Sequence, residues 1–183
     1  MIGRANLANV LCAMAVATEL GVPPEEAAAR ARDLAPARHR GEVRRLGGGV
    51  TVVDDSYNAS PAALKQALDT LSRQAGDHRR VAVLGEMLEL GDRADELHRS
   101  VGHAAQVAGV GLLVTVGGAA AAAMADAAVA AGLPADAVHH VATSTEAADV
   151  MAGAVRPGDI VLVKGSRGVK TEVVVDRLVA VCG

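Results

Sequence analysis

The residues best suited to chemistry stand together at positions 52–61, which read Val-Val-Asp-Asp-Ser-Tyr-Asn-Ala-Ser-Pro. Two β-branched residues, typical of a strand, lead into two adjacent carboxylates and a polar turn, and Pro61 can then open a helix. Because ligands of open α/β sheets bind beyond the carboxyl ends of the strands, this segment is a candidate site. It also holds Tyr57, the one aromatic residue of a chain without Phe or Trp.

The paired carboxylates admit more than one interpretation. Asp54 and Asp55 could bind a divalent metal, accept hydrogen bonds from ribose hydroxyls, or act as an acid–base pair. They could equally cap the helix near Pro61 and brace the loop. Adjacent side chains point in different directions, so the two do not easily grip one ligand together. Asn58 and Ser60 both fit N-cap chemistry, and capping is the interpretation that we favour for Ser60.

A second candidate site is Lys164-Gly165-Ser166-Arg167-Gly168, which follows a predicted strand and precedes a predicted helix. Two cations, a hydroxyl and backbone N–H groups near a helix start are well suited to binding an anion. The alternative is a solvated, charged turn. The GxxxxGK[ST] pattern of a P-loop does not occur in this sequence.

Two further groups of residues carry weaker signals. Residues 85–91, Gly-Glu-Met-Leu-Glu-Leu-Gly, could line a cleft or simply reverse the chain. His98 and His103 miss the i,i+4 spacing of a metal pair on a helix, and His139 and His140 alternate across a strand. We expect structural or surface roles for these histidines, and no metal site.

The composition indicates a folded protein whose core is built from small side chains. Hydrophobic residues, mostly Ala and Val, make up 51% of the 183 residues. The net charge of −3 argues against a nucleic-acid binder with a broad basic surface. Cys12 and Cys182 belong to no metal or disulfide pattern. With no apolar run of the roughly 18–20 residues that span a bilayer, and no secretory signal, we expect a cytoplasmic protein without a membrane partner.

The pattern of apolar residues and chain breakers predicts two helices followed by an α/β domain. Residues 7–18 and 25–34 should be helical, with Pro36 and the basic residues 37–40 as a linker. Strands 42–46 and 50–54 flank Gly47-Gly48-Gly49, which we interpret as a hairpin turn. Further strands are expected at 80–84, 111–116, 137–141 and 159–163, and helices at 61–74, 94–107, 118–131, 145–153 and 169–181. Such βα units imply a Rossmann-like three-layer sandwich with a mainly parallel sheet.

Several of these features occur in the order that is found in one known family. They are Gly3-Arg4-Ala5-Asn6-Leu7-Ala8-Asn9, similar to a G-x-H-N-x-x-N helix start, then Arg40, residues 54–61, residues 83–91 with His98, and residues 164–167. On these features the chain resembles the C-terminal portion of the Mur ligases over nearly its whole length. Residues 54–61 and 83–91 are most similar to the branch that adds D-alanyl-D-alanine to UDP-N-acetylmuramoyl-tripeptide.

The resemblance implies an ATP- and Mg²⁺-dependent carboxylate–amine ligase of peptidoglycan precursor synthesis. In such a reaction ATP phosphorylates the tripeptide carboxylate, and the amine of D-alanyl-D-alanine attacks the acyl phosphate. By the same resemblance Asn9 is expected to contact adenine, Arg40 the nucleotide phosphates and Asp55 the ribose. The candidates for the incoming dipeptide and its carboxylate are Asn58, Lys164, Ser166 and Arg167.

The chain departs from the family in two respects. Ala5 stands where the family usually has His. More seriously, the P-loop, the Mg²⁺ ligands, the catalytic lysine and the UDP-sugar-binding domain are not in this sequence. We therefore expect no catalytic residue in this chain, no ATP turnover by it alone, and weak or undetectable nucleotide binding, because one wall of a cleft leaves a ligand solvated.

The resemblance also divides the chain. Residues 1–37 should be the last two helices of the central ATPase domain, and residues 38–183 the mobile C-terminal domain, with residues 36–40 as the hinge. Closure would carry Arg40, Asp55 and the Lys164 loop over the nucleotide and exclude water.

Two other interpretations stay open. The chain could be a stand-alone, non-catalytic domain that binds nucleotide, peptide or another protein on the same sheet. An ordinary dinucleotide-dependent enzyme is a weaker hypothesis, because no GxGxxG follows the first strand of any βα unit.

Overall fold

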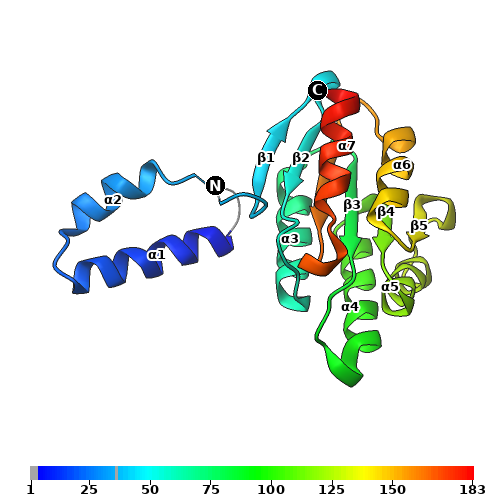
Figure 1. The fold of residues 1–183 in the computed structure, drawn as a ribbon, viewed down its shortest axis with the longest axis horizontal. Helices are drawn as coiled ribbons and strands as arrows, with labels where there is room; N and C mark the ends of the chain where they lie inside the picture. The colour runs from blue at the N-terminus through cyan, green and yellow to red at the C-terminus, as the bar shows by residue number, and fades with distance from the viewer. Residues whose placement is uncertain (1–3, 36) are drawn as a thin grey trace.

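The computed structural model describes residues 4–35 and 37–183 (Figure 1). Gly3 of the helix-start motif and Pro36 of the predicted linker lie outside these residues, as do the side chains of residues 4–6. No helix within the described ranges is long and apolar enough to cross a membrane.

The N-terminal part is a helix pair, as the sequence predicts. Helix α1 covers Arg4–Glu19 and α2 covers Pro24–Arg32, and Gly21 between them has φ +89°, a value that suits glycine. Helix α2 begins at a proline and carries acidic residues in its first turn and basic residues in its last, which matches the helix dipole. Figure 1 shows this pair set apart from the main body, on the side of strand β1.

Among the described residues, six strands form one sheet in the order β1-β2-β6-β3-β4-β5. Only the β1–β2 hairpin is antiparallel, and every other neighbouring pair is parallel. The strands are β1 Glu42–Arg45, β2 Thr51–Asp54, β3 Arg80–Gly85, β4 Val110–Val116, β5 Val138–Val141 and β6 Ile160–Lys164.

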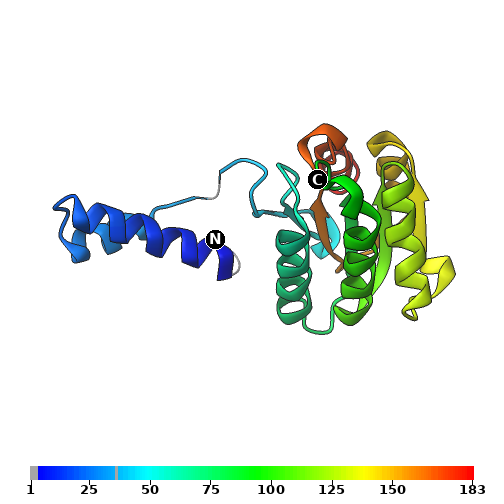
Figure 2. The same cartoon turned by 90° about the horizontal axis from the view of Figure 1, so that it is seen from below.

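Helices cover both faces of this sheet, so the predicted α/β three-layer sandwich is confirmed (Figures 1 and 2). Helices α3 (Pro61–Gln74), α4 (Ala94–Val107) and α5 (Ala119–Ala130) pack on one face, against Ala82 and Leu84 of β3. Helices α6 (Ser144–Ala154) and α7 (Glu172–Cys182) pack on the other, against Val81 and Val83 of the same strand. This alternation of two buried faces explains why β3 is apolar throughout.

Short 3-10 turns are the elements that the apolar pattern does not predict. They cover Gly47–Gly49, Gly91–Arg93, Ala135–Ala137 and Arg167–Val169. The first closes the β1–β2 hairpin, so the turn interpretation of Gly47–Gly49 is confirmed. The last shortens the predicted helix 169–181: Lys170 has φ +59°, which no α-helical residue adopts, so α7 begins only at Glu172.

Candidate functional site

The order of the strands creates a crevice beside the carboxyl end of β6. Strand β2 leads into α3 on one face of the sheet, whereas its parallel neighbour β6 leads into α7 on the opposite face. Chains that leave adjacent strand ends toward opposite faces leave room between them, and ligands of α/β proteins bind at such points.

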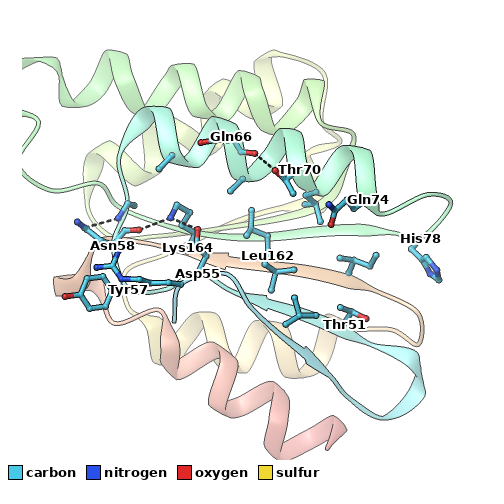
Figure 3. Close-up of a pocket in the computed structure, with 18 of the residues that line it drawn as sticks. Thr51, Asp55, Tyr57, Asn58, Gln66, Thr70, Gln74, His78, Leu162 and Lys164 are labelled. Carbon is cyan, nitrogen blue, oxygen red and sulfur yellow. Dashed lines mark hydrogen bonds and ion pairs between the residues drawn. The ribbon is translucent and has the colours of Figure 1, made fainter. Parts of the chain in front are cut away.

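A groove of about 790 Å³ opens here and runs along the sheet beside α3 (Figure 3). Its lining includes the apolar residues Val53, Ile160 and Leu162 of β2 and β6, which also belong to or pack against the core under α3. The volume lies within the range that small-molecule sites occupy. The polar residues at its carboxyl end, together with one from α1, are Asn9, Arg40, Asp55, Tyr57, Asn58, Ser60 and Lys164.

An ion pair between two distant segments forms the floor of the polar end. Nζ of Lys164 lies 2.6 Å from Oδ2 of Asp55 and also donates to the backbone oxygen of Asn58 at 2.9 Å. Lys164 is only 5% exposed, so these two partners compensate for the burial of its side-chain nitrogen. Strand alternation explains why Lys164 and Asp55 lie together. Lys164 comes two positions after Leu162, and Asp55 two positions after Val53, so both point to the α3 face of the sheet, as Leu162 and Val53 do.

The neighbouring carboxylates have separate environments, as adjacent positions of an extended chain should. Asp55 faces the groove, whereas Asp54 is fully buried and accepts a hydrogen bond from the Ser56 hydroxyl at 2.6 Å. Asp54 therefore braces the loop, one of the alternatives that the sequence left open. Within the described ranges no group of three or more His, Cys, Asp or Glu residues could hold a metal ion.

The turn after the carboxylates starts helix α3. The Ser60 hydroxyl accepts from the N–H of Ala63 at 3.4 Å, with Pro61 at the first helical position, so the capping interpretation is confirmed. The Asn58 side chain instead accepts from the N–H of Ala59 at 2.9 Å, and Asn58 itself lines the groove. Tyr57 lies at the same rim, and the Arg40 guanidinium stacks on its ring, 3.9 Å from the centroid.

Ser166 and Arg167, two of the residues predicted to bind peptide, do not line this groove. Ser166 is buried, and its hydroxyl accepts from the N–H of Leu88 at 2.9 Å. Nη1 of Arg167 lies 2.6 Å from Glu172 on the following helix. Both side chains thus belong to contacts within the chain rather than to the groove.

Glycine residues allow the carboxyl ends of β6 and β3 to lie very close together. A Cβ atom built on Gly165 would lie 3.0 Å from the Cα of Gly85, so the ends of β6 and β3 touch through backbone. Residues 85–91 pack here and do not line the groove. Nε2 of His98 accepts from the N–H of Met87 at 2.9 Å, with the ring tautomer assigned from the hydrogen-bond network. The predicted structural role of this histidine is confirmed.

Sequence reasoning missed the far part of the groove and one of the partners of Asp54. Gln66, Thr70 and Gln74 of α3 line one wall, with Thr51 and His78 near the amino ends of the strands (Figure 3). A signal for the wall is present, because three polar residues at i,i+4 spacing form a stripe on one helix face. No pattern in the sequence predicts that the ring of His39 contacts Asp54.

The fold and the groove define an α/β protein with a site for a small-molecule ligand at the carboxyl ends of its parallel strands. A comparison with known families places the chain in one of them. The sequence profile described as "Mur ligase, glutamate ligase domain" matches residues 39–167. The chain belongs to the Mur ligase family.

Within that family the chain is similar to MurF. It is 40% identical, over 99% of its length, to the UDP-N-acetylmuramoyl-tripeptide–D-alanyl-D-alanine ligase of Mycobacterium tuberculosis, of which it covers 39%. Against the ligase of the same name from Bacillus subtilis the identity is 30%, over 98% of this chain and 39% of the relative. The chain thus spans about two fifths of the length of these relatives.

Solved structures show the same similarity. MurF ligase from Thermotoga maritima in complex with ADP superposes with a TM-score of 0.78 at 27% identity, covering 98% of this chain and 39% of that one. MurF from Acinetobacter baumannii gives a TM-score of 0.84 at 25% identity, over 97% of this chain and 38% of that one. The resemblance to the C-terminal portion of the family, and the fold class that it implies, are confirmed.

Proposed function

We propose that this chain is the C-terminal part of an ATP-dependent carboxylate–amine ligase of peptidoglycan precursor synthesis, working in the cytoplasm. The ligase joins D-alanyl-D-alanine to UDP-N-acetylmuramoyl-tripeptide through an acyl phosphate. The observation that carries the proposal is the groove at the β2–β6 crevice, which gathers five of the seven expected ligand residues in a chain that matches MurF relatives throughout.

The groove residues have chemistry that fits these substrates. Asp55 can accept hydrogen bonds from two ribose hydroxyls, the guanidinium of Arg40 matches phosphate oxygens, and the amide of Asn9 can read the edge of adenine. Asn58 and Lys164 lie beside Asp55 and are our candidates for the incoming dipeptide.

Arg167 and Ser166 lie outside the groove lining, so their roles in the proposal differ from those of the groove residues. The Arg167 side chain is 57% exposed, so it can exchange Glu172 for a ligand carboxylate at little cost. Ser166 is held by Leu88 and acts through the shape of its loop.

The chemical step itself needs groups from outside this chain. The amine of the dipeptide forms a C–N bond with the acyl carbon, the C–O bond to phosphate breaks as phosphate leaves with its electron pair, and the nitrogen gives up one proton, which the leaving phosphate takes. The described residues include no group of three or more His, Cys, Asp or Glu residues that could hold a metal ion, so in this proposal the ligands of Mg²⁺ come from outside this chain. This chain contributes binding, orientation and the exclusion of water from the acyl phosphate.

In this proposal residues 1–37 belong to the central ATPase domain and residues 38–183 form the C-terminal domain. The chain alone then turns over no ATP and holds nucleotide only weakly, since it offers one wall of the cleft.

The test joins this chain to a matching N-terminal portion of a MurF ligase and measures phosphate release that depends on D-alanyl-D-alanine. We expect release from the joined protein and none from the chain alone. Asp55→Asn should raise the KM for ATP about tenfold, because an amide accepts the ribose hydroxyls less well than a carboxylate. Asp69→Asn, which removes an exposed carboxylate of α3 that lies outside the groove, is the matched control.

Two results would contradict the proposal. Undiminished turnover in Asp55→Asn would remove the site assignment. A joined protein that is folded and binds ATP but releases no phosphate would favour the non-catalytic binding domain instead.

A further inference from the structure

Asp54 is a buried charge that the proposed chemistry does not use. It is fully buried, and four groups surround its carboxylate: Nδ1 of His39 at 2.8 Å, the Ser56 hydroxyl at 2.6 Å, the Ser56 N–H at 3.3 Å and Nη2 of Arg44 at 3.6 Å. Burial of a carboxylate costs free energy unless it is paired and hydrogen-bonded. The partners therefore fix Asp54, and Asp54 in turn fixes them.

His39, the partner of Asp54 that comes from the linker, is held in an unusual backbone conformation. His39 has φ +61°, a left-handed value that is uncommon outside glycine although histidine is among the residues that adopt it most often. Such a conformation persists when its surroundings enforce it. Two contacts do so here: the ring meets Asp54, and the backbone oxygen of His39 accepts from the N–H of Tyr57 at 3.1 Å.

These contacts place two proposed ligand groups from different segments in one groove. Arg40, next to His39, lies over the ring of Tyr57, and Asp55, next to Asp54, is paired with Lys164. Arg40 and Asp55, which directly follow His39 and Asp54 in the sequence, are thus the two residues that would meet the nucleotide. The antiparallel pairing of β1 with β2 brings Glu42 opposite Asp54, and the contact of His39 with Asp54 adds a side-chain restraint on the residues just before β1.

We propose that Asp54 and His39 are positioning residues: their contact docks the linker segment 37–41 on the loop after β2 and so sets Arg40 and Asp55 at a fixed spacing. Arg40 then moves with the sheet, and the hinge between the two parts of the chain lies before His39. The proposal rests on the proposed function only for what Arg40 and Asp55 bind, because the docking itself needs no ligand.

Tyr57 makes the docking measurable in the 183-residue chain. It is the one aromatic residue, and both cysteines are free, so the near-UV circular dichroism reports on its surroundings alone. We compare His39→Asn, which keeps a residue that tolerates positive φ but removes the ring, with Asp54→Asn. His103→Asn, an exposed position on α4, is the matched control.

We expect His39→Asn and Asp54→Asn to lose most of the Tyr57 near-UV signal while far-UV spectra stay native, and His103→Asn to keep it. If Asp54→Asn fails to fold, His39→Asn decides alone, because the His39 side chain, unlike that of Asp54, is partly exposed. An unchanged Tyr57 signal in a folded His39→Asn variant overturns the proposal, as does an equal loss in His103→Asn.

A second readout separates this proposal from the proposed function. In the joined ligase, His39→Asn should raise the KM for ATP about tenfold and leave kcat within about twofold. If the wild-type joined protein releases no phosphate, the proposed function fails while the Tyr57 result still stands. If phosphate is released and the KM for ATP does not change in His39→Asn, the positioning role is wrong.

Discussion

At the scale of single residues, the pair between Lys164 and Asp55 is unequal. The ammonium group of Lys164 is almost wholly buried, whereas the Asp55 side chain is 27% exposed toward the groove. Water can therefore replace the lysine as a partner of Asp55 more easily than it can replace Asp55 as a partner of the lysine. The lysine would be left with the backbone oxygen of Asn58 alone.

Asp55→Ala and Lys164→Met should consequently lower the free energy of unfolding by different amounts. Asp55→Ala should lower the free energy of unfolding by about 2–4 kcal/mol, because it leaves a buried ammonium group without a counter-charge. Lys164→Met keeps much of the side-chain volume and leaves a carboxylate that water reaches, so we expect a loss of about 1–2 kcal/mol. Urea unfolding of both variants measures the difference. Equal losses, or a larger loss for Lys164→Met, would contradict this account.

The sequence predicts which residues point to the groove better than it predicts their partners. Strand alternation already separates Asp54 from Asp55, and helix-start chemistry already assigns Ser60 as a cap. The contact of Asp54 with His39 and the burial of Ser166 depend on how distant segments pack. No local pattern contains that information, so Ser166 resembled a free hydroxyl in the sequence.

At the scale of elements, the small side chains of this sequence allow very close packing. A Cβ atom built on Gly102 of α4 would collide with the backbone oxygen of Met124 and lie 3.0 Å from the backbone nitrogen of Ala128, both on α5. The helices thus meet backbone to backbone at this point, which a core of Ala and Val makes possible. Helix periodicity predicted both helices, but their mutual approach is a tertiary property.

Gly102→Ala should therefore destabilise the fold even though alanine favours helices. The added methyl group meets backbone atoms that cannot rotate away, so we expect a loss of about 1–3 kcal/mol or more in the free energy of unfolding. Gly153→Ala is the matched control, since nothing lies within 4 Å of its Cβ position in α6, and it should gain up to about 1 kcal/mol. Urea midpoints of the two variants test the pair. A stabilised Gly102→Ala variant would show that α4 and α5 can separate freely.

At the scale of the whole molecule, the two parts of the chain differ in how they are packed. Both hydrophobic cores are built from residues after position 49, on the two faces of the sheet. Helix α1 instead exposes large apolar side chains, with Leu7, Leu11 and Val16 between 54% and 60% exposed, and Leu20 just after it is 80% exposed. Clustered exposed apolar residues are typical of a surface that another part of a protein covers. In the proposed ligase that part is the rest of the central domain.

Residues 38–183 alone should therefore keep the fold, because the truncation removes no member of either core and retains His39 and Arg40. We expect its free energy of unfolding, measured in urea, to stay within about 0.5 kcal/mol of that of the whole chain, with the Tyr57 near-UV signal intact. Removal of the exposed α1 side chains should also reduce self-association, which sedimentation can measure at matched concentrations. Loss of a cooperative transition on truncation would mean that the helix pair and the sheet form one folding unit, and the proposed boundary at residue 37 would then be wrong.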